Sequence, residues 1–182
     1  MALAADLLGR AISLMKPDDP GRLELLPNLG SALARTGQLA RADVVLNEAI
    51  EGAVAIGAQR LASHALVERA LWRLWSDPDS EGDARATAED ALLVFEEHGD
   101  ELGLAKACRL LHDVAPTWDE GEEALARALV YARRAGDQRE EADILWWVGV
   151  RFLFGPMHAE EAIRRCEEIL SDAKYDGTGP AR

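Results

Sequence analysis

The sequence predicts an all-α protein built from about nine helices that pair into antiparallel hairpins. Three observations lead to this prediction. Ala and Leu are abundant, whereas only 5% of the residues are aromatic. Apolar residues recur at three- and four-residue spacing along most of the chain, which is the period of an amphipathic helix. Turns that contain Gly or Pro separate these amphipathic stretches at near-even intervals.

The stretch 23–56 is the clearest hairpin. Three leucines lie on one face of its first helix: Leu26, Leu29 and Leu33. Gly30 lies beside this face, where a side chain would block the approach of a neighbouring helix. Because Gly37 adopts a positive φ at little cost, we expect the first helix to end there and the chain to turn.

The second helix of this hairpin carries one stripe of a small, a large and a small residue: Ala42, Leu46 and Ala49. Small residues let two helix axes come close, and a large one fills the groove between them. The first small residue of the stripe recurs along the chain at Ala4, Ala42, Ala84, Gly121 and Ala159. These positions are 38, 42, 37 and 38 residues apart, so one structural unit repeats.

In chain order, the sequence predicts one half repeat and four full hairpins. Residues 2–15 form the second helix of an incomplete repeat, and the Asp-, Pro- and Gly-rich segment 16–21 ends it. The full hairpins cover about 22–57, 59–98, 101–136 and 138–173. We expect residues 1–175 to form a single domain and residues 176–182 to form a flexible tail.

Each later helix has its own apolar stripe. The helices that begin the hairpins carry Leu61, Val67 and Leu71, then Leu104, Ala107, Cys108 and Leu111, then a nearly continuous apolar run at 144–154. The helices that close them carry Ala84, Ala88 and Ala91, then Gly121, Leu125 and Ala128, then Ala159, Ile163 and Cys166. Glu68 stands where the first hairpin has Gly30, which is a departure from the pattern. Two cysteines are too few for a disulfide framework, and both fall at expected helix contacts, so we expect buried thiols.

The hairpin at 23–56 resembles the tetratricopeptide repeat. That family's 34-residue unit has large, large, small and large residues on its first helix, and small, large and small residues on its second. The matching residues are Leu26, Leu29, Gly30 and Leu33, then Ala42, Leu46 and Ala49. The chain departs from the family where Leu26 replaces the common Trp and where no Pro closes the unit. The resemblance implies an α-solenoid, in which stacked hairpins form a right-handed superhelix with the first helices along its concave face.

Composition and charge exclude several classes of protein. With 48% hydrophobic and 29% charged residues, the chain is globular rather than disordered. A net charge of -13 argues against a nucleic-acid partner, because binding phosphates needs a basic face. The chain has no apolar run of 18 residues and no signal-peptide pattern, so we expect no membrane association and a cytoplasmic protein.

The first helices carry a candidate groove for a partner. Its residues, taken from the family's register, are Arg35, Arg69, Trp72, Arg73, Arg109 and His112 at exposed positions, together with Trp146. Arginine binds carboxylates or phosphates bidentately and Trp is a frequent hot spot, so we expect an acidic protein or peptide. The alternative is that the four arginines pair with the protein's own carboxylates. Of Trp146 and Trp147, we expect one to pack between hairpins and the other to approach the groove.

We expect no catalytic, cofactor or metal site. The Lys and Asn residues with which some family members clamp a peptide's C-terminal carboxylate are absent from the matching positions. The acidic run 77–83 has oxygen ligands at alternate positions, as in a calcium loop, but Ala88 replaces the bidentate Glu at the twelfth position. The histidines and cysteines lie at no zinc-ligand spacing, and no serine lies in a nucleophile motif.

These observations favour a non-catalytic protein–protein interaction or scaffolding module that binds a peptide or a partner domain in its concave groove. The Ala-, Leu-, Arg- and Glu-rich texture, as in Ala132–Asp137, also resembles the helical-repeat regions of large bacterial regulators. That resemblance implies a regulatory segment whose partners include other domains of a longer chain. Two alternatives stay open: a solenoid that senses a small-molecule or nucleotide effector, and a structural segment that oligomerises through exposed end helices.

Overall fold

The computed structural model describes residues 2–16 and 19–175, and the regular elements in this part of the chain are all helical. Its α-helices are α1 (Ala2–Ser13), α2 (Pro20–Arg35), α3 (Leu39–Ala55), α4 (Gln59–Arg73), α5 (Glu81–His98), α6 (Glu101–Asp113), α7 (Trp118–Ala135), α8 (Gln138–Phe154) and α9 (Ala159–Tyr175). A short 3₁₀ helix, η1 (Pro78–Ser80), precedes α5. The predicted all-α class is therefore confirmed, and the tail expected at 176–182 lies outside the described residues.

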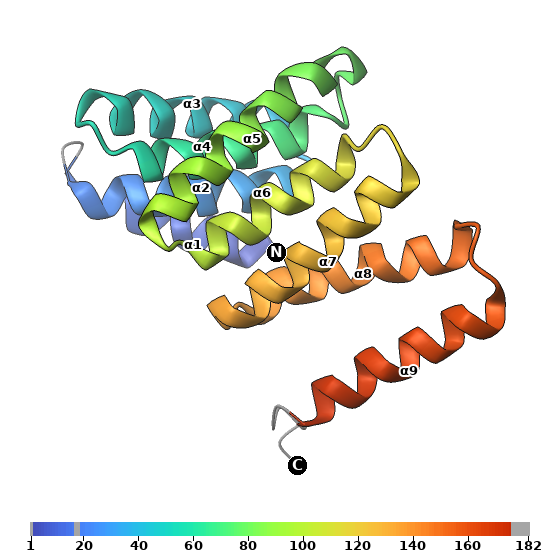
Figure 1. Cartoon of the computed structure of the whole chain (residues 1–182). Coiled ribbons are helices and arrows are strands. Elements are labelled where there is room, and N and C mark those ends of the chain that lie inside the picture. Colours follow the sequence, from blue (N-terminus) through green and yellow to red (C-terminus); the bar gives the residue numbers. More distant parts are fainter. Residues whose placement is uncertain (1, 17–18, 176–182) are drawn as a thin grey trace.

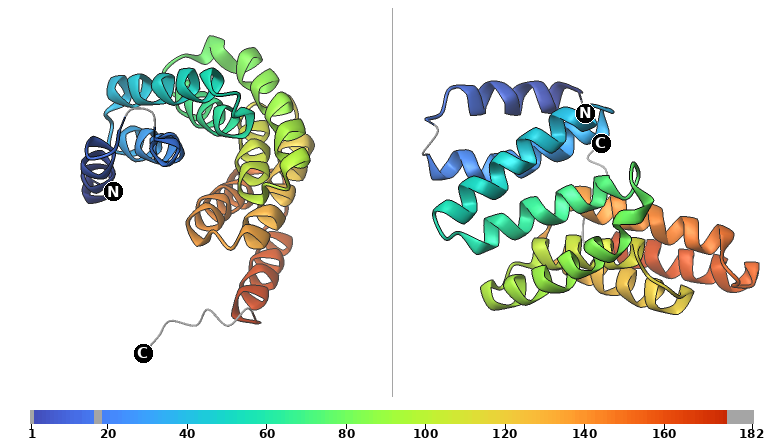
Figure 2. Two further views of the ribbon diagram at one scale, coloured as in Figure 1. Left: turned by 90° about the vertical axis from the view of Figure 1, so that its left-hand side faces the viewer. Right: turned by 90° about the horizontal axis from the view of Figure 1, so that it is seen from above.

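Each helix packs against the next one in the chain, and the chain reverses direction from helix to helix (Figure 1). In addition, α2 contacts α4, α4 contacts α6, and α6 contacts α8. Among the described residues, the odd-numbered helices make no such contacts with one another. The helices follow a curved path from α1 to α9 (Figure 2). Only the even-numbered helices contact their counterparts in the next hairpin, so they lie on the inner side of this curve. We call the surface formed by α2, α4, α6 and α8 the inner face.

The turns between helices use the local signals that the sequence predicts. Gly37 connects α2 to α3 with a φ of 77°, a left-handed conformation that favours glycine, so the expected turn is confirmed. Gly57, Gly99 and Gly136 also have a positive φ, in the turns before α4, α6 and α8. Side chains that accept hydrogen bonds from backbone N–H groups begin four helices, and these caps are Asp19, Asp100, Thr117 and Asp137.

The apolar core consists of three clusters that follow one another from α1 to α8. The predicted stripes are buried in α3 (Ala42, Leu46 and Ala49), in α5 (Ala84, Ala88 and Ala91) and in α7 (Gly121, Leu125 and Ala128). Leu46 fills the space that the missing side chain of Gly30 leaves, since a Cβ built on Gly30 would lie 2.5 Å from Leu46 Cγ. The small residue in α2 therefore has the packing role that the sequence predicts.

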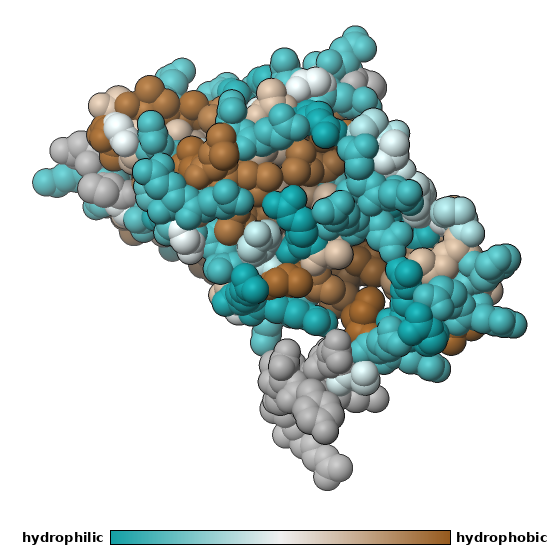
Figure 3. Space-filling view, viewed as in Figure 1, coloured by the Kyte–Doolittle hydropathy of each residue, from teal (hydrophilic) through white to brown (hydrophobic). Residues whose placement is uncertain are grey.

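The outermost helices are covered less completely than the centre. Cys108 is buried in α6, as expected, but Cys166 is exposed, so the expectation for that thiol was wrong. The reason is that α9 packs its backbone closely only against α8, touches α7 through the Arg165–Glu122 ion pair, and leaves the side that carries Cys166 uncovered. Apolar side chains also reach the surface over α3 and in the gap between α8 and α9 (Figure 3). None of the described helices combines the length and the apolar character that a bilayer crossing needs.

We expect opposite effects on stability for two Gly→Ala substitutions, because Gly30 is packed against α3 and Gly149 in α8 has open space beside it. In Gly30→Ala the new methyl group would collide with the buried Leu46 side chain, so we expect a loss of about 1–3 kcal/mol in the free energy of unfolding. Gly149→Ala is the matched control in α8, where a Cβ would meet nothing within 4 Å. This control should gain about 0.5–1 kcal/mol from helix propensity. Urea unfolding followed by circular dichroism measures both values, and equal stability of the two variants would contradict the packing described.

Candidate functional site

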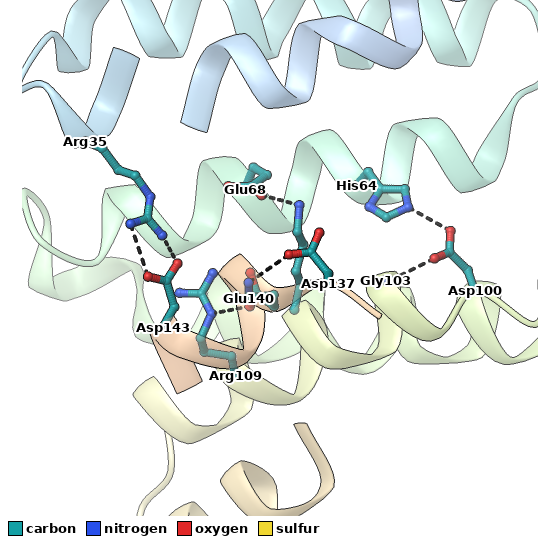
Figure 4. A network of polar contacts seen from close by, with 10 residues as sticks. Arg35, His64, Glu68, Asp100, Gly103, Arg109, Asp137, Glu140 and Asp143 are labelled. Carbon is teal, nitrogen blue, oxygen red and sulfur yellow. Dashed lines mark hydrogen bonds and ion pairs between the residues drawn. The ribbon is translucent and has the colours of Figure 1, made fainter. Parts of the chain in front are cut away.

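Two buried ion pairs connect α4, α6 and α8 on the inner face (Figure 4). Lys106 Nζ lies 2.6 Å from Glu68 Oε1, and Arg109 Nε donates to Glu140 Oε1 at 2.7 Å. At most 10% of any of these four side chains is exposed. Glu68 in α4 stands where α2 has Gly30, and Lys106 supplies the opposite charge from α6, although the repeat places Cys108 at the matching position of that helix. The departure from the repeat pattern at Glu68 is therefore matched by a countercharge in the next hairpin.

The ion pairs keep their charges despite burial. Burial alone would raise the pKa of Glu68, but the attraction of Lys106 outweighs it and holds the pKa below the ordinary value of a glutamate. Burial alone would lower the pKa of Lys106, and the nearby Glu68 carboxylate raises it instead. Both members of the pair are therefore charged near neutral pH.

A third ion pair joins α2 to α8, although its members are 108 residues apart in the sequence (Figure 4). The Arg35 guanidinium meets the Asp143 carboxylate through both of its terminal nitrogens, and Nη1 donates to Oδ1 at 3.2 Å. The same guanidinium lies over the Trp72 ring, 5.8 Å from its centre. This contact holds the first full hairpin against the last one across the inner face.

Beside these ion pairs lies a pocket of about 240 Å³ that we call the tryptophan pocket. Helices α2, α4, α6 and α8 contribute to it, together with Trp75 just after α4. Its lining residues are Arg35, Leu71, Trp72, Trp75, Arg109, Asp113, Asp143, Trp146 and Trp147. It thus collects four of the five tryptophans of the chain.

The aromatic rings of the pocket stand at different angles to one another. Trp146 and Trp147 meet edge to face, with centroids 4.8 Å apart and planes inclined by 77°. Trp75 lies 6.3 Å from Trp147 at an angle of 41°. Trp147 packs into the core, while Trp146 is 61% exposed and lies at the rim of the pocket. This is the division of roles that we expected for the Trp146-Trp147 pair.

The structure brings together only some of the predicted groove residues. Arg35, Trp72, Arg109 and Trp146 line the tryptophan pocket. Arg69 and Arg73 lie with Trp72 along a neighbouring hollow between α3 and α4.

His112 packs toward α7 and α8, where its Nδ1 lies 3.2 Å from the Gly121 carbonyl oxygen and its ring lies 5.5 Å from that of Trp147. Burial, and after it the charge of Arg151, lowers the pKa of His112 to about 4, so this ring is neutral at pH 7.

Of the six positions predicted as exposed, only Arg73 is exposed, and Arg35, Arg69 and Trp72 are half-buried. Arg109 is only 8% exposed because α8 covers it and supplies Glu140, and the His112 side chain is likewise only 8% exposed.

The four arginines all have acceptors within the protein. Arg69 donates to Asn47 Oδ1 at 2.6 Å, and Arg73 lies 3.1 Å from Asp43 Oδ1. Arg35 and Arg109 have Asp143 and Glu140 as described above. Three of the four arginines thus pair with the protein's own carboxylates, as the alternative expected, and Arg69 donates to an amide oxygen instead.

Asp113 is the site residue that sequence reasoning missed. It follows Arg109 by one helical turn and lines the tryptophan pocket. Within the described part of the chain its carboxylate makes no hydrogen bond, and His112 Nε2, on a ring that is neutral at pH 7, lies 4.0 Å from its Oδ1. Burial raises the pKa of Asp113 to about 6, against the opposing effect of Arg109. The sequence does place Asp113 one helical turn after Arg109, on the same side of the helix. It does not show that Arg109 pairs with Glu140 and leaves Asp113 without an ion-pair partner.

The described residues hold no group of three or more potential ligands that could bind a metal ion. The acidic run 77–83 passes through η1 into the first turn of α5, so it does not form the open loop that calcium requires. Burial raises the pKa of the Cys108 thiol to about 11, which makes it a poor nucleophile. Comparison with known protein families, curated proteins and solved structures gave no match.

The buried pair of Glu68 and Lys106 predicts a non-additive pair of substitutions. Lys106→Met leaves the Glu68 carboxylate buried without its countercharge, so we expect a loss of about 3–5 kcal/mol in stability. The double variant Glu68→Leu/Lys106→Met removes both charges and should recover most of that loss. Urea unfolding of the two variants tests this expectation, and a double variant no more stable than Lys106→Met would show that the pair is not an isolated unit.

Proposed function

We propose that the chain is a non-catalytic interaction module that binds a peptide or a partner domain on its inner face. The observation that supports this most is the tryptophan pocket, whose rings come from both α4 and α8 and are open to solvent at two places. Trp75 is 69% exposed and Trp146 is 61% exposed. Exposed tryptophans that gather at one hollow are typical of binding surfaces, because a Trp side chain buries a large apolar area when a partner covers it.

The proposal includes a tetratricopeptide-like α-solenoid with a right-handed superhelical path. Three features support it: the near-even spacing of equivalent positions, the packing of Leu46 on Gly30, and the contacts that α2, α4, α6 and α8 make in series. In such an architecture each hairpin contacts only its neighbours, and the first helices form one continuous binding surface. We further propose that the module is the regulatory segment of a larger cytoplasmic bacterial regulator, so that its partner is another protein or another domain of the same polypeptide.

An acidic partner would bind near Arg69 and Arg73, in the hollow next to the tryptophan pocket. Arg73 has 48% of its side chain exposed, and its ion pair with Asp43 is open to solvent on both sides. Exposed pairs of this kind contribute little and exchange readily, so an incoming carboxylate competes with Asp43 at small cost. Arg109 offers no such opportunity, because its partner Glu140 is buried with it.

A small-molecule effector is the second candidate. The observation that favours it is the size of the tryptophan pocket, about 240 Å³, which suits a compact ligand better than a folded domain. In this case Trp75, Trp146 and Trp147 contact the ligand, and the ion pair between α2 and α8 couples binding to the relative position of the hairpins.

Peptide binding on the inner face predicts a selective loss in tryptophan variants. The probes are arrayed fifteen-residue peptides in acidic, neutral and basic sets of equal apolar content. We expect Trp75→Ala/Trp146→Ala to lose binding by about tenfold or more, because hot-spot aromatics carry much of the binding energy. Trp118→Ala is the matched control, since Trp118 lies on α7 away from the tryptophan pocket.

The same array separates the candidate functions. Binding that survives in Trp75→Ala/Trp146→Ala would place the interaction elsewhere, and an array without any binder would overturn the peptide proposal. Preferential binding of the acidic set, lost in Arg73→Glu, would support the hollow between α3 and α4 as the contact.

A further inference from the structure

We propose that the tryptophan pocket binds an organic cation, an ammonium or guanidinium group, with tryptophan rings as its walls and Asp113 as its counterion. This inference rests on the proposed function, because it names the ligand chemistry of the same pocket. It also gives the pocket the opposite preference to the acidic partner that the sequence suggested.

Tryptophan rings form much of the lining of the pocket. Trp146 and Trp147 are inclined by 77° and form a corner, and Trp75 stands beside Trp147 at 6.3 Å. The face of an indole ring carries the negative part of its quadrupole, and Trp is the strongest of the aromatic residues in attracting a cation. Because Trp75, Trp146 and Trp147 line the same pocket, we infer that their attraction for a cation acts there together.

The pocket already contains one cation–π contact. The Arg35 guanidinium lies 5.8 Å from the centre of the Trp72 ring, within the range in which such contacts are attractive. Asp143 holds Arg35 in this position from α8. The resident guanidinium therefore occupies the Trp72 side of the pocket, and Trp75, Trp146 and Trp147 remain for a ligand.

The charges that line the pocket leave one carboxylate without a partner. Arg35 is paired with Asp143, and Arg109 donates to Glu140 at 2.7 Å. Asp113 makes no hydrogen bond among the described residues.

The imidazole nearest to Asp113 is neutral at pH 7, because the pKa of His112 is lowered to about 4. A carboxylate that is largely removed from water without a partner is costly, and a bound cation would relieve that cost.

An anion would meet the opposite situation. To reach a guanidinium it would have to displace Asp143 from Arg35 or Glu140 from Arg109, and Asp113 would repel it. Two buried donors without an acceptor, Arg35 Nε and Trp72 Nε1, do not change this balance. Each has less than 1 Å² of exposed surface, so a ligand in the pocket does not contact them in this conformation.

Choline and its neutral isostere 3,3-dimethylbutan-1-ol test the inference directly, because the two molecules have nearly the same shape and differ in charge. Titration into the folded protein is followed by tryptophan fluorescence and by calorimetry. We expect choline to bind saturably and at least about tenfold more tightly than the isostere. Asp113→Asn should weaken choline by about tenfold, whereas Glu97→Gln, an exposed carboxylate on α5, should leave it unchanged.

Trp146→Leu is a second variant in case Asp113→Asn alters folding, since Trp146 is mostly exposed and its loss should cost binding but not helicity. Equal affinity for choline and the isostere, or unchanged choline binding in both variants, would overturn the inference.

Two further comparisons show whether the bound cation is a side chain of a partner protein or a free amine. Peptides that contain trimethyllysine or arginine, compared with acetyl-lysine peptides, test for the side chain of a partner protein. Tighter binding of the cationic peptides than of choline would assign the pocket to a partner side chain, and choline binding without peptide binding would assign it to a free amine and overturn the peptide proposal. Peptide binding through Trp146 without any preference for cations would overturn this inference and leave the proposed function standing.

Discussion

The ion pairs that run from α4 through α6 to α8 determine what the inner face of this protein offers to a ligand. Glu68, Lys106, Arg109 and Glu140 are almost fully buried, and the α6 residues Lys106 and Arg109 each bond to a different neighbouring helix. A charge in such surroundings is tolerated only when its partner is in place, so the pairs constrain how three consecutive first helices align. Between α2 and α3 the alignment of the helices is instead constrained by close packing, because Leu46 lies against Gly30.

The consequence for recognition is that positive charge on this face is neutralised from within. Arg109 is used by Glu140, and Arg35 is used by Asp143 in a contact that spans the face from α2 to α8. The groups of the tryptophan pocket that these ion pairs do not use are the tryptophan rings and the Asp113 carboxylate. The sequence predicted a positively charged groove. At the tryptophan pocket, however, both arginines are paired, and the charged group without an ion-pair partner is the Asp113 carboxylate.

The helices, their turns and the buried stripes of α3, α5 and α7 could be predicted because their signals are local, whereas the stripe predicted for α9 was wrong, since Ala159, Ile163 and Cys166 are exposed. Gly37 ends α2 where its conformational freedom indicates, and the small-large-small stripe of α3 is buried as a unit. The exposure of charged side chains was predicted less well, because it depends on which countercharge the next hairpin supplies. Arg109 is the example, since Glu140 buries it and no periodicity within α6 encodes that. Lys106 is a second example, because it pairs with Glu68 although the repeat places Cys108 at the position that matches Glu68.

The net charge of the chain favours a cationic ligand, whereas the arginines of the predicted groove had suggested an acidic one. A chain with a net charge of -13 attracts cations at long range, and a partly buried carboxylate beside aromatic rings strengthens that attraction at one place. For an anionic ligand the long-range field and the local pocket oppose binding together. For a cationic ligand the long-range field speeds the encounter and the tryptophan rings hold the group once its water is removed. The overall charge and the local geometry thus favour the same class of ligand.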